Sequence, residues 1–277
     1  VGSTNTLVNS AKLKCLSWIS PIEKTNDGLM IYEQPKEDHT YVITVDTARG
    51  QGKDYSAFVI IDITDPPYKV VAKFRNNLIS PLVYPTVIKS VAEKYNQAFC
   101  LIEINDIGQQ VADILNRDLE YEHVLMTVYK GRAGQQISGG FGGANTNLGV
   151  RTTTPVKKLG CSVLKSLIEN DKLIIEDVDT VNEMITFVAK GQSFEADEGH
   201  NDDLAMCLVL FGWLTRQEYF KNLTNLDVRT DIYQDEMQRI EDEILPFGFI
   251  STEDTNDVTF FDSGDMWKAD STDSAEL

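Results

Sequence analysis

The chain has 277 residues, of which 42% are hydrophobic and 25% are charged, and its formal net charge is −18. This composition excludes a disordered chain, and the length allows a core that needs no disulfide staples. No apolar run approaches the roughly 20 residues of a membrane span and no signal sequence opens the chain, so we expect an intracellular protein that is not secreted.

The negative charge is concentrated near the end of the sequence. Residues 226–277 hold 15 acidic and 3 basic residues, a net −12, which leaves −6 for residues 1–225. The main part of the chain is therefore only mildly acidic and can still gather local basic patches for a nucleic acid. We predict a lead-in strap or former interdomain linker over residues 1–40, a folded domain over 41–225 and an acidic, partly disordered extension over 226–277.

The predicted domain opens with three strands. The runs at residues 41–46, 55–62 and 69–75 are rich in β-branched and aromatic residues, and Gly- or Pro-bearing turns separate them. Short connections between consecutive strands predict an antiparallel meander.

The next segment alternates helices with strands. Apolar residues at helical spacing follow Pro81, and the continuous apolar run at 98–103 is typical of a strand that is buried on both faces. A helix is predicted over 106–117 and a further short strand over 123–128. Together these patterns predict an α/β fold with a mixed sheet, in which parallel strands follow the three antiparallel ones and helices flank them.

The second half of the domain begins with a glycine-rich segment. Residues 131–149 contain seven glycines, which is compatible with a flexible loop or with a hairpin that approaches a ligand closely. A helix over 152–169, a strand over 172–175 and a segment at 183–189 of either type follow. A strand over 193–196 then precedes an apolar helix over 204–213.

Acidic residues stand where predicted elements begin or end. Asp46 ends the first strand, Glu103 ends the fourth, and Asp202 and Asp203 precede the apolar helix. In a sheet of this strand order the first and fourth strands are neighbours, so the two strand-end carboxylates converge and the helix start can add a third. Clustered carboxylates favour Mg²⁺ or Mn²⁺, and a pair of such ions can hydrolyse a phosphodiester. His200 is a candidate for orienting the water or adding a ligand.

Each acid also has an ordinary structural explanation. Acids at strand ends often form turns or are simply solvated, and Asp202 or Asp203 is a good N-cap for the helix that follows. The functional interpretation depends on the combination of these positions, and it leaves the choice between Asp202 and Asp203 open.

Three short motifs carry a resemblance to a known family. The segments Thr44–Gly50 with Asp54–Ser56, Leu101–Asn105 and His200–Ala205 resemble, in order and spacing, the nuclease domain of the large terminase subunit of tailed bacteriophages. The resemblance covers roughly residues 30–220. It implies a ribonuclease-H-like fold, a metal-dependent endonuclease of low sequence specificity that cuts concatemeric viral DNA, and metal ligation by Asp46, Glu103 and one or both of Asp202 and Asp203.

The resemblance also implies partners. Double-stranded DNA is the expected substrate, and the portal, the small terminase subunit and an ATPase domain are expected partners in the cytoplasm of the infected host. No G-x-x-x-x-G-K-[ST] motif occurs here, so we expect the ATPase domain to lie before Val1. Seven basic residues near the motifs and the glycine-rich segment are candidates for phosphate contacts: Arg49, Lys53, Lys130, Arg132, Arg151, Lys157 and Lys158.

Other functions share parts of this pattern. The turn from Asp46 to Gly50 followed by Ser56 is similar to the first phosphate-binding turn of actin-like phosphotransferases, although the chain is short for two such domains. A Holliday-junction resolvase or a ribonuclease H shares the carboxylate cluster, and an assembly module in which the acids only cap and solvate is a further alternative.

Overall fold

The computed structural model describes residues 5–131, 134–138, 146–191, 193–224, 261–262 and 265–266. The chain divides into two compact units, residues 1–230 and 231–277. In the second unit the described residues form one antiparallel pair, β13 (Phe261–Asp262) and β14 (Asp265–Met266). The acidic extension predicted for 226–277 otherwise lies outside the described residues, and the predicted domain boundaries stay predictions.

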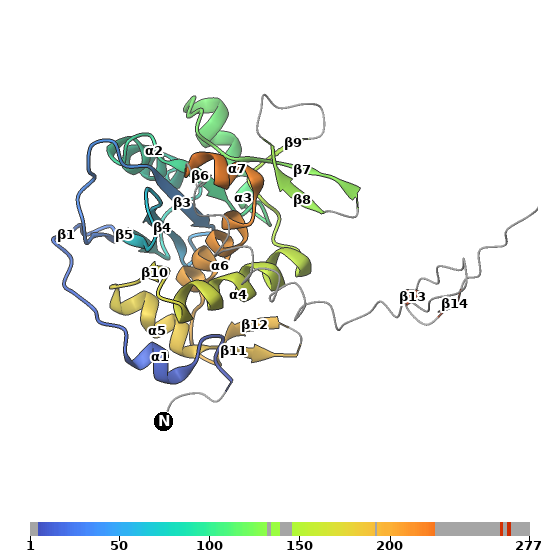
Figure 1. Cartoon of the computed structure of the whole chain (residues 1–277). Coiled ribbons are helices and arrows are strands. Elements are labelled where there is room, and N and C mark those ends of the chain that lie inside the picture. Colours follow the sequence, from blue (N-terminus) through green and yellow to red (C-terminus); the bar gives the residue numbers. More distant parts are fainter. Residues whose placement is uncertain are drawn as a thin grey trace, which may run out of the picture. The chain divides into compact units, whose positions relative to one another are not determined.

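The first unit is built on a seven-stranded mixed sheet (Figure 1). The strand order is β1-β2-β5-β4-β3-β6, and β10 pairs with β5. The strands are β1 (Glu23–Lys24), β2 (Leu29–Ile31), β3 (Tyr41–Asp46), β4 (Ser56–Asp62), β5 (Tyr68–Asn76), β6 (Phe99–Ile102) and β10 (Leu173–Ile174). The meander of β3, β4 and β5 is antiparallel, whereas β6 runs parallel to β3. The predicted mixed sheet is confirmed.

Helices cover both faces of this sheet. On one face, residues of α2 (Tyr84–Lys94) and α3 (Gly108–Asp113) share a core with Ile43, Val45 and Ile102. Successive side chains of a strand point to opposite faces, so Asp46 and Glu103 lie on the other face. There α6 (Asp203–Thr215) packs against β3 and β4.

The helix α6 lies between the sheet and α4 (Thr154–Glu169), and every one of its residues is buried. Glycines allow the two helices to approach closely. A Cβ atom added at Gly160 of α4 would lie 2.3 Å from the backbone oxygen of Val209. Among the described residues, no helix combines the length and apolarity needed to cross a membrane.

A small sheet and several short elements complete the first unit. The strands β7 (Met126–Tyr129), β8 (Gln135–Ile137) and β9 (Thr146–Leu148) form a separate antiparallel sheet in the order β8-β7-β9. The remaining elements are α1 (Ser10–Lys14), a π-helical turn η1 (Ile114–Asp118), α5 (Val178–Thr186), β11 (Phe187–Lys190), β12 (Ser193–Ala196) and α7 (Glu218–Leu223).

Three local expectations need correction, and one open alternative is resolved. Part of the strap expected over residues 1–40 belongs to the main sheet, because β1 and β2 lie within residues 23–31. Gly28 makes the turn between these strands with φ +110°, and Ile31 buries its side chain beside β5. The helix α2 begins at Tyr84, three residues after Pro81. The strand expected at 123–128 is β7, which belongs to the small three-stranded sheet and not to the main sheet. The ambiguous segment 183–189 is the end of α5 followed by β11.

Candidate metal and nucleic-acid site

Asp46 and Glu103 lie side by side at the carboxyl ends of two neighbouring strands. Val45 of β3 is in register with Ile102 of β6, and the backbone N–H of Glu103 donates to the Val45 oxygen at 2.9 Å. The carboxyl group of Glu103 lies beside that of Asp46 and raises its pKa. The structure therefore brings these two predicted acids together, as the strand order requires.

Polar neighbours fix the orientation of both carboxylates. The backbone N–H of Thr47 donates to Asp46 Oδ1 at 2.7 Å, and the side-chain amide of Asn105 donates to Glu103 Oε1 at 3.0 Å. The chain then folds tightly over the end of β6, since a Cβ atom at Gly108 would lie 1.8 Å from the Glu103 backbone oxygen. Only glycine can begin α3 at this point without moving Glu103.

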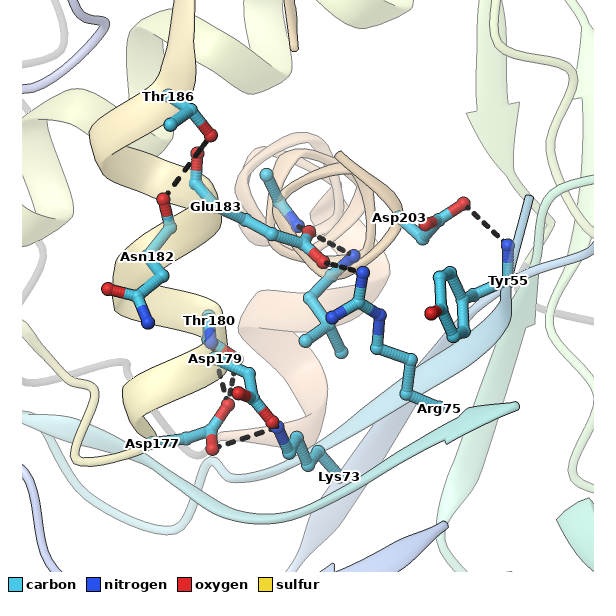
Figure 2. Close-up of polar contacts among 12 residues, drawn as sticks. Tyr55, Lys73, Arg75, Asp177, Asp179, Thr180, Asn182, Glu183, Thr186 and Asp203 are labelled. Carbon is cyan, nitrogen blue, oxygen red and sulfur yellow. Dashed lines mark hydrogen bonds and ion pairs between the residues drawn. The ribbon is translucent and has the colours of Figure 1, made fainter. Parts of the chain in front are cut away.

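The helix α6 brings Asp203 to the same end of the sheet. Asp203 is 7% exposed, and its Oδ1 accepts a hydrogen bond from the backbone N–H of Tyr55 at 3.3 Å (Figure 2). Its other oxygen, Oδ2, is buried and has no hydrogen-bond partner among the residues that the structure describes. Asp203 and Asp46 line the same cavity.

Burial opposes the ionisation of Asp46 and Asp203. Burial raises the pKa of Asp46 well above its ordinary value, and the neighbouring carboxyl groups of Glu103 and Asp203 raise it further. Burial also raises the pKa of Asp203 to about 6, although Arg75 and the N–H of Tyr55 act in the opposite direction. A nearby cation would relieve this penalty, because it favours the charged form of each acid.

Asp202 and His200 lie differently from Asp203. Asp202 Oδ2 accepts a hydrogen bond from the backbone N–H of Ala196 at 3.2 Å. Burial raises the pKa of Asp202, and Lys157 opposes that shift. His200 is exposed in the turn before α6, where its backbone N–H donates to Asp197. Neither Asp202 nor His200 is among the described residues that line the cavity.

A cavity of about 300 Å³ opens beside Asp46 and Asp203, and Glu103 is not among the described residues that line it. Its lining combines the acids with polar and basic side chains of the β3–β4 turn: Asp46, Thr47, Ala48, Arg49, Gln51, Lys53, Asp54, Asp106 and Asp203. Arg49 forms a two-point ion pair with Asp106, with Nε to Oδ2 at 2.7 Å and Nη2 to Oδ1 at 2.5 Å. Of the seven predicted phosphate-contacting residues, Arg49 and Lys53 therefore lie at the cavity.

The other five predicted basic residues are more scattered. Lys130 and Arg151 are exposed where β7 ends and before α4 begins, and Lys158 is exposed on α4. Lys157 is half-buried, with its ammonium 5.9 Å from the centre of the Phe187 ring. Arg132 lies outside the described residues. A role for these five in DNA binding stays a prediction.

A fourth acid near the cluster, which is buried, was not predicted from the sequence. Glu183 of α5 is 5% exposed, and its carboxylate accepts hydrogen bonds from the backbone N–H groups of Leu204 and Ala205 (Figure 2). Burial raises its pKa to about 7, and Asp203 raises it further while Ala205 and Arg75 lower it. In the sequence, the sign of a buried acid at this position is that Glu183 stands between the apolar residues Val181 and Met184. That sign was weak, because the segment was compatible with either a strand or a helix.

The donor set suits a hard divalent cation. Among the residues that the structure describes, no three His, Cys, Asp or Glu side chains form a group that could hold a metal ion. The arrangement consists of the neighbouring pair Asp46 and Glu103 with Asp203 beside them. Carboxylate oxygens of the kind present on Asp46, Glu103 and Asp203 are the ligands that Mg²⁺ and Mn²⁺ prefer, and within the described part of the chain Asp203 Oδ2 has no hydrogen-bond partner.

A comparison with known protein families identifies the family of this chain. The family described as the terminase RNaseH-like domain matches residues 43–211. The chain belongs to this family. The match confirms the resemblance seen in the sequence and makes this domain a nuclease-type domain of viral DNA packaging with a ribonuclease-H-like fold.

Solved structures support the fold of this terminase RNaseH-like domain. The large terminase nuclease from the thermophilic phage G20c with bound magnesium aligns with a TM-score of 0.58 at 18% identity, covering 78% of this chain and 100% of that chain. The same nuclease with bound cobalt aligns with a TM-score of 0.56 at 21% identity and with the same coverage. At this identity the likeness concerns the fold.

Proposed function

We propose that this terminase RNaseH-like domain is a divalent-metal-dependent endonuclease that cuts concatemeric viral double-stranded DNA during genome packaging, with little sequence specificity. The observation that supports the proposal most is the meeting of Asp46 and Glu103 on adjacent strands with Asp203 beside them. The phage G20c nuclease of similar fold has been crystallised with magnesium and with cobalt.

Three carboxylates would hold the metal, and they would have to move together to do so, because the described residues contain no group of three such side chains already gathered around one point. Asp46 and Glu103 would be ligands from β3 and β6, and Asp203 would be the ligand from α6 because its Oδ2 has no other partner in the part of the chain that the structure describes. Asp202 is the weaker candidate, since its Oδ2 already accepts the Ala196 N–H. When bound, a pair of Mg²⁺ or Mn²⁺ ions supplies an activated water and stabilises the charge on the departing phosphodiester oxygen.

The remaining residues at the site would position the ligands and the DNA. Asn105 holds Glu103, and the backbone N–H of Thr47 holds Asp46. Arg49 and Lys53 at the cavity would contact backbone phosphates, which places the scissile bond at the acids without reading base identity. The role of His200 in orienting the water stays a prediction, because its exposed turn gives no support for it.

The wider setting of the reaction follows from the same proposal. DNA would be delivered by the packaging motor in the infected cell's cytoplasm, with an ATPase domain, the portal and the small terminase subunit as partners. A contribution of such partners to DNA capture fits the net charge of −18, since this charge opposes tight binding of DNA by the whole chain alone.

Nicking of supercoiled plasmid tests the proposal. We expect the wild-type chain to nick plasmid with Mn²⁺ or Mg²⁺ and to stop when EDTA is added. The variants Asp46→Ala and Glu103→Ala should cut at least about 1,000-fold more slowly, since a catalytic metal contributes several kcal/mol to transition-state stabilisation. Asp202→Asn is the matched control, because it changes an adjacent acid whose Oδ2 already has a partner, and it should cut at close to the wild-type rate.

Substrate comparison separates the alternatives. Plasmid, a four-way junction and an RNA–DNA hybrid should be offered at equal concentration, and we expect the duplex plasmid to be cut without a preference for junctions or hybrids. Nicking by Asp46→Ala at the wild-type rate would refute the proposed site. Turnover of ATP with no cleavage would favour the actin-like alternative.

A further inference from the structure

The helix α6 begins without a cap from its own sequence. Asp202 occupies the N-cap position, but its side chain makes no capping hydrogen bond and instead contacts the N–H of Ala196 on β12. The first N–H groups of a helix have no partners within the helix, and leaving them unpaired in a buried position is unfavourable. The start of α6 therefore needs an acceptor from elsewhere in the fold.

Glu183 supplies this acceptor from another helix. Its Oε2 accepts from the N–H of Leu204 at 2.7 Å and from the N–H of Ala205 at 3.0 Å. Glu183 lies in the last turn of α5, and its carboxylate is placed at the positive end of the α6 dipole. The two donors, Leu204 and Ala205, directly follow Asp203 in the chain. Glu183 therefore holds the first turn of α6 in place next to Asp203.

Arg75 links Glu183 back to the strand side of the site. Its Nη2 lies 3.3 Å from Glu183 Oε1, and its guanidinium lies 3.9 Å from the centre of the Tyr55 ring. The backbone N–H of Tyr55 in turn donates to Asp203 Oδ1. Figure 2 shows these side chains gathered around the start of α6, with Asp203 and Tyr55 on one side and Glu183 on the other.

We propose that Glu183 and Arg75 are positioning residues for Asp203. By capping α6 in place of Asp202 or Asp203, Glu183 leaves Asp203 Oδ2 uncommitted, and Arg75 holds Glu183 and Tyr55 in the arrangement that orients Asp203. The part of this inference that concerns metal binding rests on the proposed function. The part that concerns the orientation of Asp203 does not.

The variant Glu183→Gln tests the inference with little change of shape. Its amide oxygen can still accept from Leu204 and Ala205, but the ion pair with Arg75 is lost. Two readouts are needed besides cleavage: hydrogen exchange of the Tyr55 amide in the metal-free protein, and calorimetric titration with Mn²⁺. We expect faster Tyr55 exchange than in wild type and about 10- to 100-fold weaker Mn²⁺ binding, which is the typical effect of removing a group that orients a metal ligand.

The matched control is Asp177→Asn. Asp177 is also a buried carboxylate that caps a helix, since it accepts from the Thr180 N–H at 2.8 Å at the start of α5, and it pairs with Lys73 at 3.0 Å. It lies at the opposite end of α5 from Glu183. This control should lower the melting temperature while leaving Tyr55 exchange and Mn²⁺ affinity at their wild-type values.

The outcomes separate positioning from simple capping. If Glu183→Gln lowers only the melting temperature, with Tyr55 exchange and Mn²⁺ affinity unchanged, Glu183 is a structural cap and the inference is wrong. If this variant does not fold, Arg75→Gln, which leaves the cap on α6 intact, is measured in the same way and decides the question. If wild type neither binds Mn²⁺ nor nicks plasmid, the proposed function fails, and Tyr55 exchange still tests the orientation of Asp203.

Discussion

Replacing Asp203 by Asn should make the metal-free protein more stable at neutral and alkaline pH while abolishing cleavage. Asp203 is 7% exposed, and burial raises its pKa to about 6. Above that pH the folded protein must hold an ionised carboxylate beside Asp46, whose own pKa is raised partly by Asp203. An amide at position 203 removes this charge and can still accept the Tyr55 N–H.

The size of the effect follows from the pKa. A shift from the ordinary value of 3.8 to about 6 corresponds to on the order of 3 kcal/mol of lost folding stability at high pH. The new N–H group of the amide costs part of this gain, so we expect a net stabilisation of about 2 kcal/mol. For a domain of this size that corresponds to roughly 4 to 8 °C in melting temperature.

The sign of the pH dependence is specific. Well below pH 4 Asp203 is protonated in both the folded and the unfolded wild type, so only the cost of the new amide N–H remains and the variant should be no more stable than the wild type. Between pH 4 and about 6, Asp203 ionises in the unfolded wild type while it keeps its proton in the folded wild type. The wild type therefore loses stability as the pH rises, and the stability of Asp203→Asn relative to the wild type increases.

Thermal melts in EDTA from pH 4 to 8 measure this difference. Asp171→Asn serves as the control, because Asp171 is 82% exposed and a surface charge of this kind contributes little. A difference between Asp203→Asn and wild type that is constant across this pH range, or that is largest at pH 4, would refute the reasoning.

Three further predictions concern the surroundings of the acids. Gly108→Ala should lower unfolding stability by at least about 2 kcal/mol in urea melts and reduce nicking, since the added Cβ would overlap the Glu103 backbone oxygen; unchanged nicking would contradict the tight fold over β6. Asp106→Asn should free Arg49 from its ion pair, so that it can contact a phosphate. The slope of log binding constant against log salt concentration, measured by filter binding or anisotropy, should then steepen by about one released counterion, and an unchanged slope would argue against Arg49 as a phosphate contact. Gly160→Val should cost about 1 to 3 kcal/mol or more in the same urea melts by separating α4 from α6, and full stability would contradict their close approach.

The sequence was sufficient to predict the central strands and the meeting of two acids. Continuous apolar runs end at Asp46 and next to Glu103, and the order of strands and helix along the chain makes β3 and β6 neighbours. Both signals are local or topological, so they can be read without coordinates. The fold class followed for the same reason.

Other features depend on contacts between distant segments and could not be read from the sequence. Adjacent residues of a helix point about 100° apart, so the choice between Asp202 and Asp203 depends on how α6 is rotated against the sheet. The cap on α6 comes from Glu183, 21 residues before Leu204. Any acid at the start of a buried helix resembles an N-cap in the sequence, and here neither of the adjacent acids performs that role.

The register of β3 against β6 has a consequence for how far this domain can diverge. Because backbone hydrogen bonds between the two strands set the separation of Asp46 and Glu103, no surface loop determines that distance. Substitutions on the exterior can therefore accumulate over long evolutionary times without disturbing the pair. The spacing of the two reactive groups is therefore set by the backbone of the sheet and depends little on the chemistry of the outer surface.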